Sequence, residues 1–543
     1  MNKKYAFWIV AIVFLLVCIH ITSTAQELPS GQVEVVRSFQ ARLADTDKVL
    51  INAPRPVVDK KDRSYTYELI PSEAKISYEA PEIRPLAMSS EKLPEPYNGF
   101  LRGGFGYPLS PYAELGYFTG SDKFNFTGHL RHHSANDNNV ENQRFMDNDL
   151  SLKGNYFLDQ GVVIGGQVKY SLDDVFFYGY DNEDTTFTAD EARRRFNTFD
   201  GKISIRNSVP NDMDINYWAN FDFYTHSDNL GGRENGQLIR LGMEKYLDGK
   251  HPVFAEIITD LSSYSQDLES FDQFQLNNFF FVPGAAFQGD VFQLRAAVRI
   301  ASHEDEFSFF PDVKASILLA DGAFNIMAGA NGDFHKNSFR NLTQYNPFLM
   351  PGLERLRNTS FLDYYGGFFG MLENIQYEVK AGYKSMQDMA LFVPNFETPQ
   401  QFLVLYDSVN TVYVKGNIQS TWMDQVTVGL TLGYNAFSPA QQERAWQIPD
   451  LESNLSVAYH SLDKKFRLTT EIYYMNGLWA PTVTGEAERL NTLFDLSVGA
   501  DYMINKNFGI FAHLNNLASN RWRRWFDYPT YGINVLGGFS LRF

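Results

Sequence analysis

Charged side chains recur at alternate positions along this chain, and they are its best candidates for doing chemistry. Successive side chains of a β-strand point to opposite faces, so charges that alternate with apolar residues gather on one polar face. The candidates for this face are Asp212, Asp214, Asp222, Arg240, Glu244, Arg295, Arg299, Glu378, Lys380, Lys465, Arg467, Glu471, Asp495, Asp501 and Arg542. Two readings stay open: the charges line a wet lumen and select solutes, or they form paired networks that hold a filled interior shut.

Catalytic and metal-binding patterns are weak. The sequence has no His-Glu-x-x-His motif, no Gly-rich phosphate loop after a strand and only one cysteine, Cys18. His129, His132 and His133 lie close together, but adjacent strand residues such as His132 and His133 face opposite sides. We therefore expect no enzymatic activity, no catalytic residues, no cofactor and no metal site.

The last thirteen residues predict the element that would position Arg542. Its apolar face carries Tyr531, Ile533, Val535, Phe539, Leu541 and Phe543, and its other face is small or polar. An alternating strand that ends the chain on an aromatic residue is typical of outer-membrane β-barrels, with apolar residues facing lipid. We predict that this is the barrel-closing strand and the C-terminal assembly signal.

The same alternation recurs along most of the chain. Examples are 375–383, 466–474 and 494–502. Roughly 20 to 22 such segments lie between Tyr97 and Phe543, each able to cross a tilted membrane path of roughly 9 to 11 residues. The predicted fold is all-β: a transmembrane antiparallel up-and-down β-barrel of about 22 strands, within a range of roughly 16 to 22.

The N-terminus predicts export. Lys3 and Lys4 precede an apolar run, and small residues end at Ala25, so residues 1–25 read as a signal peptide. Prolines interrupt residues 26–96, which predicts a short, extended periplasmic arm. This arm either binds a partner, lies inside the lumen, or only leads into the first strand. Residues 97–543 form the predicted barrel.

The connections between strands divide by length. Tight candidates are 321–322, 462–463 and 505–506, and long candidates are 133–143, 180–195, 335–360, 434–447, 478–491 and 516–530. Short turns face the periplasm in such barrels and long loops face outward. A helical turn is expected at 351–357.

The C-terminal third resembles the closing strands of TonB-dependent receptors, especially those of Bacteroidota. The resemblance rests on Asn515–Trp522, Tyr528–Gly532, Gly537-Gly538 and terminal Phe543. It implies a receptor-type outer-membrane barrel. Members of that family carry a folded plug before the barrel, and residues 26–96 are too short and too rich in proline to resemble it, so we expect a plugless barrel.

Taken together, these patterns predict an outer-membrane channel or transport component for small polar solutes in a Gram-negative bacterium. The alternative is a non-enzymatic scaffold barrel of a larger outer-membrane complex, in biogenesis or secretion. Expected partners are outer-membrane lipid and lipopolysaccharide, the barrel assembly machinery during insertion, and a protein bound through residues 26–96. The formal charge of −17 argues against nucleic acid.

Overall fold

The computed structural model describes residues 97–137, 139–181, 186–209, 211, 213–269, 271–353 and 355–543. The predicted signal peptide (1–25) and N-terminal arm (26–96) lie outside these residues and stay predictions. The predicted lumen residue Asp212 lies outside them as well. Among the described residues, no helix combines the length and apolar character needed to cross a membrane.

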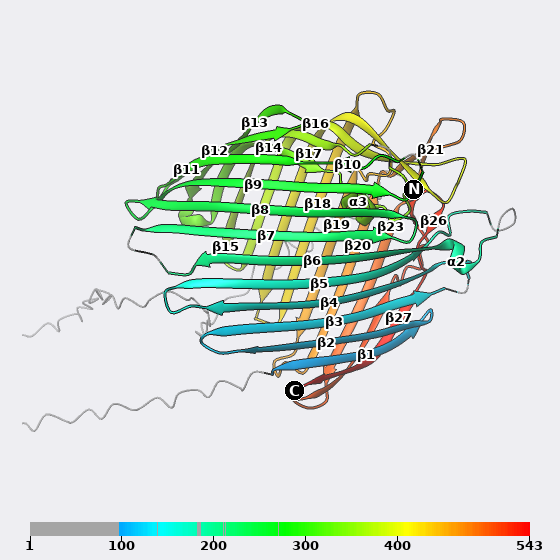
Figure 1. Cartoon of the computed structure of the whole chain (residues 1–543). Helices are drawn as coiled ribbons and strands as arrows, with labels where there is room; N and C mark the ends of the chain where they lie inside the picture. The colour runs from blue at the N-terminus through cyan, green and yellow to red at the C-terminus, as the bar shows by residue number, and fades with distance from the viewer. Residues whose placement is uncertain are drawn as a thin grey trace, which may run out of the picture. The chain divides into compact units, whose positions relative to one another are not determined.

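The main element is a closed antiparallel β-barrel of 22 strands, which confirms the predicted fold class and strand number (Figure 1). Its strands are β1 (Gly99–Tyr107), β2 (Ser110–Gly120), β3 (Phe124–Asn136), β4 (Arg144–Phe157), β5 (Val162–Phe176), β6 (Arg193–Asn207), β7 (Ile215–Asp228), β8 (Gly232–Leu247), β9 (His251–Gln266), β11 (Asn278–Gln288), β12 (Phe292–His303), β13 (Glu306–Leu319), β14 (Phe324–Lys336), β15 (Asn358–Leu372), β16 (Ile375–Pro394), β17 (Phe402–Trp422), β18 (Val426–Pro439), β19 (Leu451–His460), β20 (Phe466–Asn476), β23 (Leu493–Met503), β24 (Phe508–Asn515) and β27 (Asn534–Arg542).

Short elements lie between these strands. They are α2 (Ala189–Ala192), β10 (Phe274–Gln275), the 3-10 turn η1 (Ala320–Gly322), α3 (Phe339–Tyr345), β21 (Trp479–Pro481), β22 (Ala487–Arg489), β25 (Arg523–Trp525) and β26 (Tyr528–Pro529). α3 begins where Ser338 caps it, since the Ser338 hydroxyl accepts a hydrogen bond from the Asn341 N–H at 3.3 Å. The helical turn expected at 351–357 is wrong: the helix comes earlier, and Gly352 has a φ of +74° that helices do not use.

Alternation along the strands separates two faces. On β17, Val412, Val414 and Ile418 are 57%, 40% and 41% exposed and face outward. Tyr413 and Lys415, between them, face the other way. Large apolar side chains exposed along one face of a closed barrel fit a surface that contacts lipid.

The barrel closes where the last strand pairs with the first. β27 runs antiparallel to β1, with Leu541 opposite Leu101 and Phe539 opposite Gly103. An added Cβ at Gly103 would lie only 3.0 Å from the Phe539 ring, so glycine lets the ring pack on the backbone there. The main chains of Gly99 and Phe543 also exchange hydrogen bonds of 2.9 and 3.0 Å.

The closing strand is shorter than the alternation predicted. It begins at Asn534, so Tyr531 and Ile533 precede it and Phe543 follows it. The Asn516 side-chain amide donates to the Tyr531 carbonyl at 2.8 Å, and the Tyr531 hydroxyl donates to the Gln143 carbonyl at 3.1 Å. Loop contacts therefore replace ladder hydrogen bonds at Tyr531.

The two ends of the barrel differ. Gly99 and Phe543 lie at one end, called here the terminus end, where the predicted tight turns at 321–322, 462–463 and 505–506 are confirmed. The opposite loop end carries the long connections 337–357, 477–492 and 516–533. Two predicted loops, 133–143 and 434–447, are shorter than expected because β3 and β18 extend to Asn136 and Pro439.

Candidate functional site

α3 lies within the lumen and identifies the inner face of the wall. Its Arg340 pairs with Asp200 of β6 at 2.6 Å, while Tyr345 stacks on Phe392 of β16 with ring centroids 5.1 Å apart. β6 and β16 belong to different parts of the wall (Figure 1). A helix that touches both lies between them, so the face that carries Asp200 lines the lumen.

The strand register places the predicted charged residues of the strands on this inner face. They are Asp222 of β7, Arg240 and Glu244 of β8, Arg295 and Arg299 of β12, Glu378 and Lys380 of β16, Arg467 and Glu471 of β20, Asp495 and Asp501 of β23, and Arg542 of β27. Lys465 lies in the turn before β20, and Asp214, with a positive φ of 54°, in the turn before β7. Their action on solutes stays a prediction.

Several of these charges are paired across strands, and they do not converge on one point. The pairs are Arg102 with Asp501 (2.9 Å), Lys202 with Asp222 (3.2 Å), Arg295 with Asp312 (3.2 Å), Arg299 with Asp333 (3.6 Å) and Lys380 with Asp363 (3.7 Å). The partners Arg102, Lys202, Asp312, Asp333 and Asp363 were missed, although the same alternation on neighbouring strands could have identified them. Partly exposed pairs contribute about 1 kcal/mol or less.

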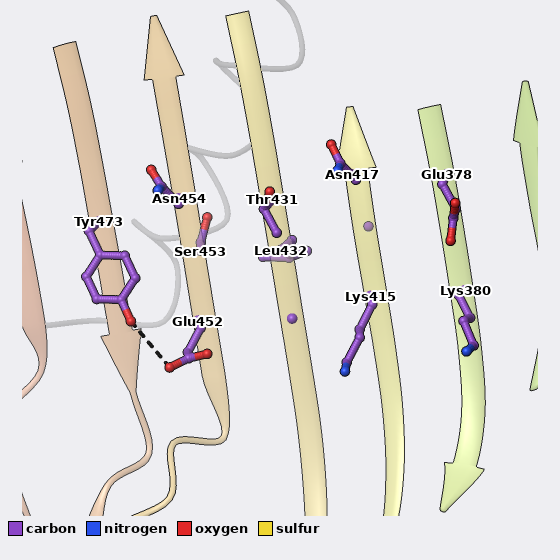
Figure 2. A pocket seen from close by; sticks show the side chains of 12 residues that line it. Glu378, Lys380, Lys415, Asn417, Thr431, Leu432, Glu452, Ser453, Asn454 and Tyr473 are labelled. Atoms are coloured by element: carbon purple, nitrogen blue, oxygen red, sulfur yellow. Dashed lines mark hydrogen bonds between the residues drawn. The ribbon is translucent and has the colours of Figure 1, made fainter. Parts of the chain in front are cut away.

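A hollow of about 510 Å³ opens on the inner face of β16–β20, and we call it the wall hollow (Figure 2). Neighbouring strands supply one row of side chains: Glu378, Asn417, Thr431, Asn454 and Tyr473. The next row consists of Lys380, Lys415, Gly433 and Glu452. Because the register is regular, charged, amide and hydroxyl groups face one shared space.

Gly433 makes room in the middle of the second row. An added Cβ there would meet nothing within 4 Å, so the missing side chain leaves open space between Lys415 and Glu452. The neighbouring strand's Gly416 faces the other way, next to inward-facing Lys415. A glycine in a strand often marks a place where another group approaches closely.

Only some of the charged side chains in the wall hollow have a hydrogen-bond or ring partner in the protein. The Tyr473 hydroxyl donates to Glu452 at 3.3 Å, and the Lys380 ammonium lies 3.5 Å from the centre of the Tyr365 ring. Glu378 has no ion-pair partner among the described residues, and Lys415 contacts only the Tyr413 ring, at 5.4 Å. One free carboxylate and one free ammonium therefore face the same space.

A folded segment fills part of the lumen at the loop end. We call residues 337–353 and 355–357 the loop cap. Its apolar side chains Phe339, Leu342, Phe348, Leu349, Leu353 and Leu356 are buried in a cluster with Phe177, Tyr264, Leu276, Phe392, Phe402, Trp525 and Tyr528. These partners come from several strands and loops, so the cap joins distant parts of the wall by apolar burial.

A buried arginine fastens the loop cap to the wall. Arg194 of β6 is fully buried, and it donates two hydrogen bonds to Asp228 of β7, at 3.0 and 2.7 Å. It also donates to the carbonyl oxygens of Pro347 (3.0 Å) and Leu349 (2.5 Å). This residue was assigned to a loop by the sequence, so its role was missed.

Two loop tyrosines pack against the loop cap: the rings of Tyr178 and Tyr528 lie 6.1 and 3.8 Å from the Phe348 ring, and their hydroxyls bind other loops. The Tyr178 hydroxyl donates to the Pro529 carbonyl at 3.1 Å, and the Tyr528 hydroxyl donates to the Gln400 carbonyl at 2.5 Å. Burial raises the pKa of Tyr178 to about 12 and the pKa of Tyr528 well above its ordinary value. Both phenols therefore stay neutral hydrogen-bond donors at physiological pH.

Three histidines near the start of the barrel bind neighbouring side chains instead of one another. His129 pairs with Glu114 at 2.9 Å, His132 bonds the Asn148 side chain at 2.7 Å, and His133 lies 3.4 Å from the Ser110 hydroxyl. Within the described part of the chain, no three His, Cys, Asp or Glu side chains form a group that could hold a metal ion.

Comparisons with known proteins agree with the fold. No protein-family model matches the chain, and no curated protein matches it by sequence. Among solved structures, the FrpB iron transporter (F3-3 variant) from Neisseria meningitidis is similar, with 9% identity over 83% of this chain and 82% of that chain and a TM-score of 0.65.

Two further structures are similar. They are the ferric-catecholate import receptor Fiu from K12 E. coli (8% identity, 83% of this chain, 82% of that chain, TM-score 0.62) and the siderophore receptor PirA from Acinetobacter baumannii (8%, 83%, 81%, TM-score 0.64). At these identities the likeness shows the fold. The described chain has the 22-strand barrel fold of TonB-dependent outer-membrane receptors.

Proposed function

We propose that this protein is an outer-membrane barrel of a Gram-negative bacterium that passes or receives small polar solutes through its lumen. The observation that carries the proposal is the wall hollow, where a free carboxylate and a free ammonium face one space beside amide and hydroxyl groups. Groups of both signs can bind polar solutes weakly enough to release them. The transporters and receptors of similar fold support a transport role.

The proposal includes a barrel without the folded plug of the receptors, because residues 26–96 are short and broken by prolines. The loop cap would then restrict the lumen from the loop end. Energised uptake by a plug-based mechanism would not be expected of such a barrel, and solutes would move down their gradients.

A second candidate is a scaffold barrel of a larger outer-membrane complex, which would bind a protein partner through residues 26–96. The loop cap favours this candidate, because apolar packing and the hydrogen bonds of buried Arg194 to the Pro347 and Leu349 carbonyls fix it in the lumen. A barrel filled in this way could act mainly as a rigid support. Contacts with lipopolysaccharide and with the assembly machinery are part of either proposal.

Single-channel conductance in a planar bilayer separates the two candidates. We expect the purified full chain to conduct steadily and Gly433→Trp to lower the conductance by roughly twofold, because the indole fills the wall hollow. Gly416→Trp is the matched control, since it adds the same side chain to the outward face of β17. A wild-type barrel that never conducts and purifies with a stoichiometric partner would exclude the channel.

A further inference from the structure

A second hollow, of about 470 Å³, opens at the terminus end of the lumen, and it is strongly basic. We call it the basic hollow; β1, β20 and β27 contribute Arg102, Arg467 and Arg542, and the turn before β20 contributes Lys464 and Lys465. Its two carboxylates are Glu114 and Asp501. Cations therefore outnumber anions here, although the whole chain has a formal charge of −17.

Both carboxylates of the basic hollow are already engaged. Asp501 accepts a hydrogen bond from the Arg102 guanidinium at 2.9 Å. Glu114 accepts from the Tyr112 hydroxyl at 2.7 Å and pairs with His129 at 2.9 Å. Asp501 also lies opposite Arg467 in the pairing of β20 with β23, but its hydrogen bond goes to Arg102.

The other cations of the hollow form no ion pair with either of these acids. Arg467, Arg542 and Lys464 have no anionic partner among the described residues, and all three side chains are exposed to the lumen or its mouth. Lys465 reaches only Asp463 of its own turn, at 3.9 Å, and both of these side chains are more than half exposed. Such an exposed pair contributes little.

A hollow beneath the loop cap shows that unpaired cations are not a general property of this lumen. It is lined by Lys169, Lys202, Lys336 and Arg340. Each of these has a carboxylate partner: Asp149 (3.3 Å), Asp222 (3.2 Å), Asp260 (2.6 Å) and Asp200 (2.6 Å), respectively. The hollow beneath the loop cap therefore differs from the basic hollow, because each of its cations has a carboxylate partner.

We propose that the basic hollow binds the anionic group of a small solute, either a carboxylate or a phosphate, an inference that rests on the proposed transport function. Guanidinium groups donate in a planar fork that matches both groups, and an anion would relieve repulsion between neighbouring cations. A basic site in an acidic protein also raises the local concentration of anions. Arg467 and Arg542 supply the forks, and Lys464 and Lys465 add positive charge at the rim.

Isothermal titration of the purified full chain in detergent tests this site with two probes, inorganic phosphate and succinate, in low-chloride buffer. We expect saturable binding of at least one probe, and binding at least tenfold weaker in the double variant Arg467→Gln/Arg542→Gln. The control Lys314→Gln removes an exposed cation from the inner face of β13, outside both hollows, and should leave anion binding unchanged. Heat-dependent gel mobility shows whether each variant is folded.

The outcomes separate the site from the transport proposal. Binding of phosphate alone or succinate alone identifies which group the site recognises. Absence of saturable binding in the wild type, or equal binding by a folded double variant, overturns the site even if the barrel conducts. Binding by a barrel that never conducts keeps the site and overturns the channel. If the double variant does not fold, two single variants replace it. Arg542→Lys should retain anion binding, and Arg542→Gln should weaken it.

Discussion

At the residue scale, buried Arg194 of the wall pairs with Asp228 of the next strand and donates hydrogen bonds to the Pro347 and Leu349 carbonyls of the loop cap. Arg194→Ala would leave Asp228 buried without its partner and free the carbonyl groups of Pro347 and Leu349. We expect a loss of about 3 to 5 kcal/mol in unfolding free energy. Urea unfolding in lipid vesicles measures it.

Arg295→Ala is the control for this change. Arg295 pairs with Asp312 on the inner face of the wall, where the two side chains are 45% and 29% exposed. Loss of this exposed pair should lower the free energy of unfolding by about 1 kcal/mol or less. Equal costs for the two variants would show that the Arg194 pair does not hold the cap.

The faces of single residues were predictable from alternation, and their contacts with distant segments were not. The inner-face positions of Arg467, Asp495 and Asp501 follow from the period of two, which is a property of the extended backbone. Arg194 lies on the same inner face as Asp200 of β6, but it is buried because the loop cap covers it there. Only the folded contacts reveal that partner.

The buried phenol of Tyr178 predicts a pH dependence. Its pKa is raised from an unfolded value of about 10 to about 12, so its stabilising contribution is complete below pH 10 and is lost as the pH rises toward 12. We expect the wild type to lose about 1 kcal/mol more stability than Tyr178→Phe between pH 9 and pH 11. Urea unfolding at the two pH values measures this difference. Equal losses would mean that the phenol ionises freely in the folded barrel.

At the element scale, the loop cap determines how far the loop end is open. Replacing residues 337–357 by a short turn between β14 and β15 removes the apolar segment from the lumen. We expect the single-channel conductance to rise severalfold, because the pore widens. Removing residues 482–486, the exposed turn between β21 and β22 at the same end, is the control and should change little.

The elements show where sequence patterns stop being sufficient. Strand number and most turns followed from alternation and from turn residues, because each strand satisfies its ladder with its neighbours. α3 and the start of β27 did not follow, since both make contacts with distant segments. Arg340 of α3 pairs with Asp200, and Tyr531 before β27 is bonded to Asn516 and Gln143. If replacing residues 337–357 by a short turn left the single-channel conductance unchanged, other loops would have to close the lumen.

At the scale of the whole molecule, an added charge should lower the unfolding free energy much more on the outer face of the wall than on the inner face. Val414 and Asn417 lie on the same strand, one facing outward and one lining the wall hollow. Val414→Arg places a guanidinium against lipid. Near the bilayer midplane, this change should lower the free energy of unfolding by about 2 to 4 kcal/mol. Asn417→Arg places it in water and should cost far less. Urea unfolding in vesicles compares the two, and similar costs would contradict a lipid-facing exterior at β17.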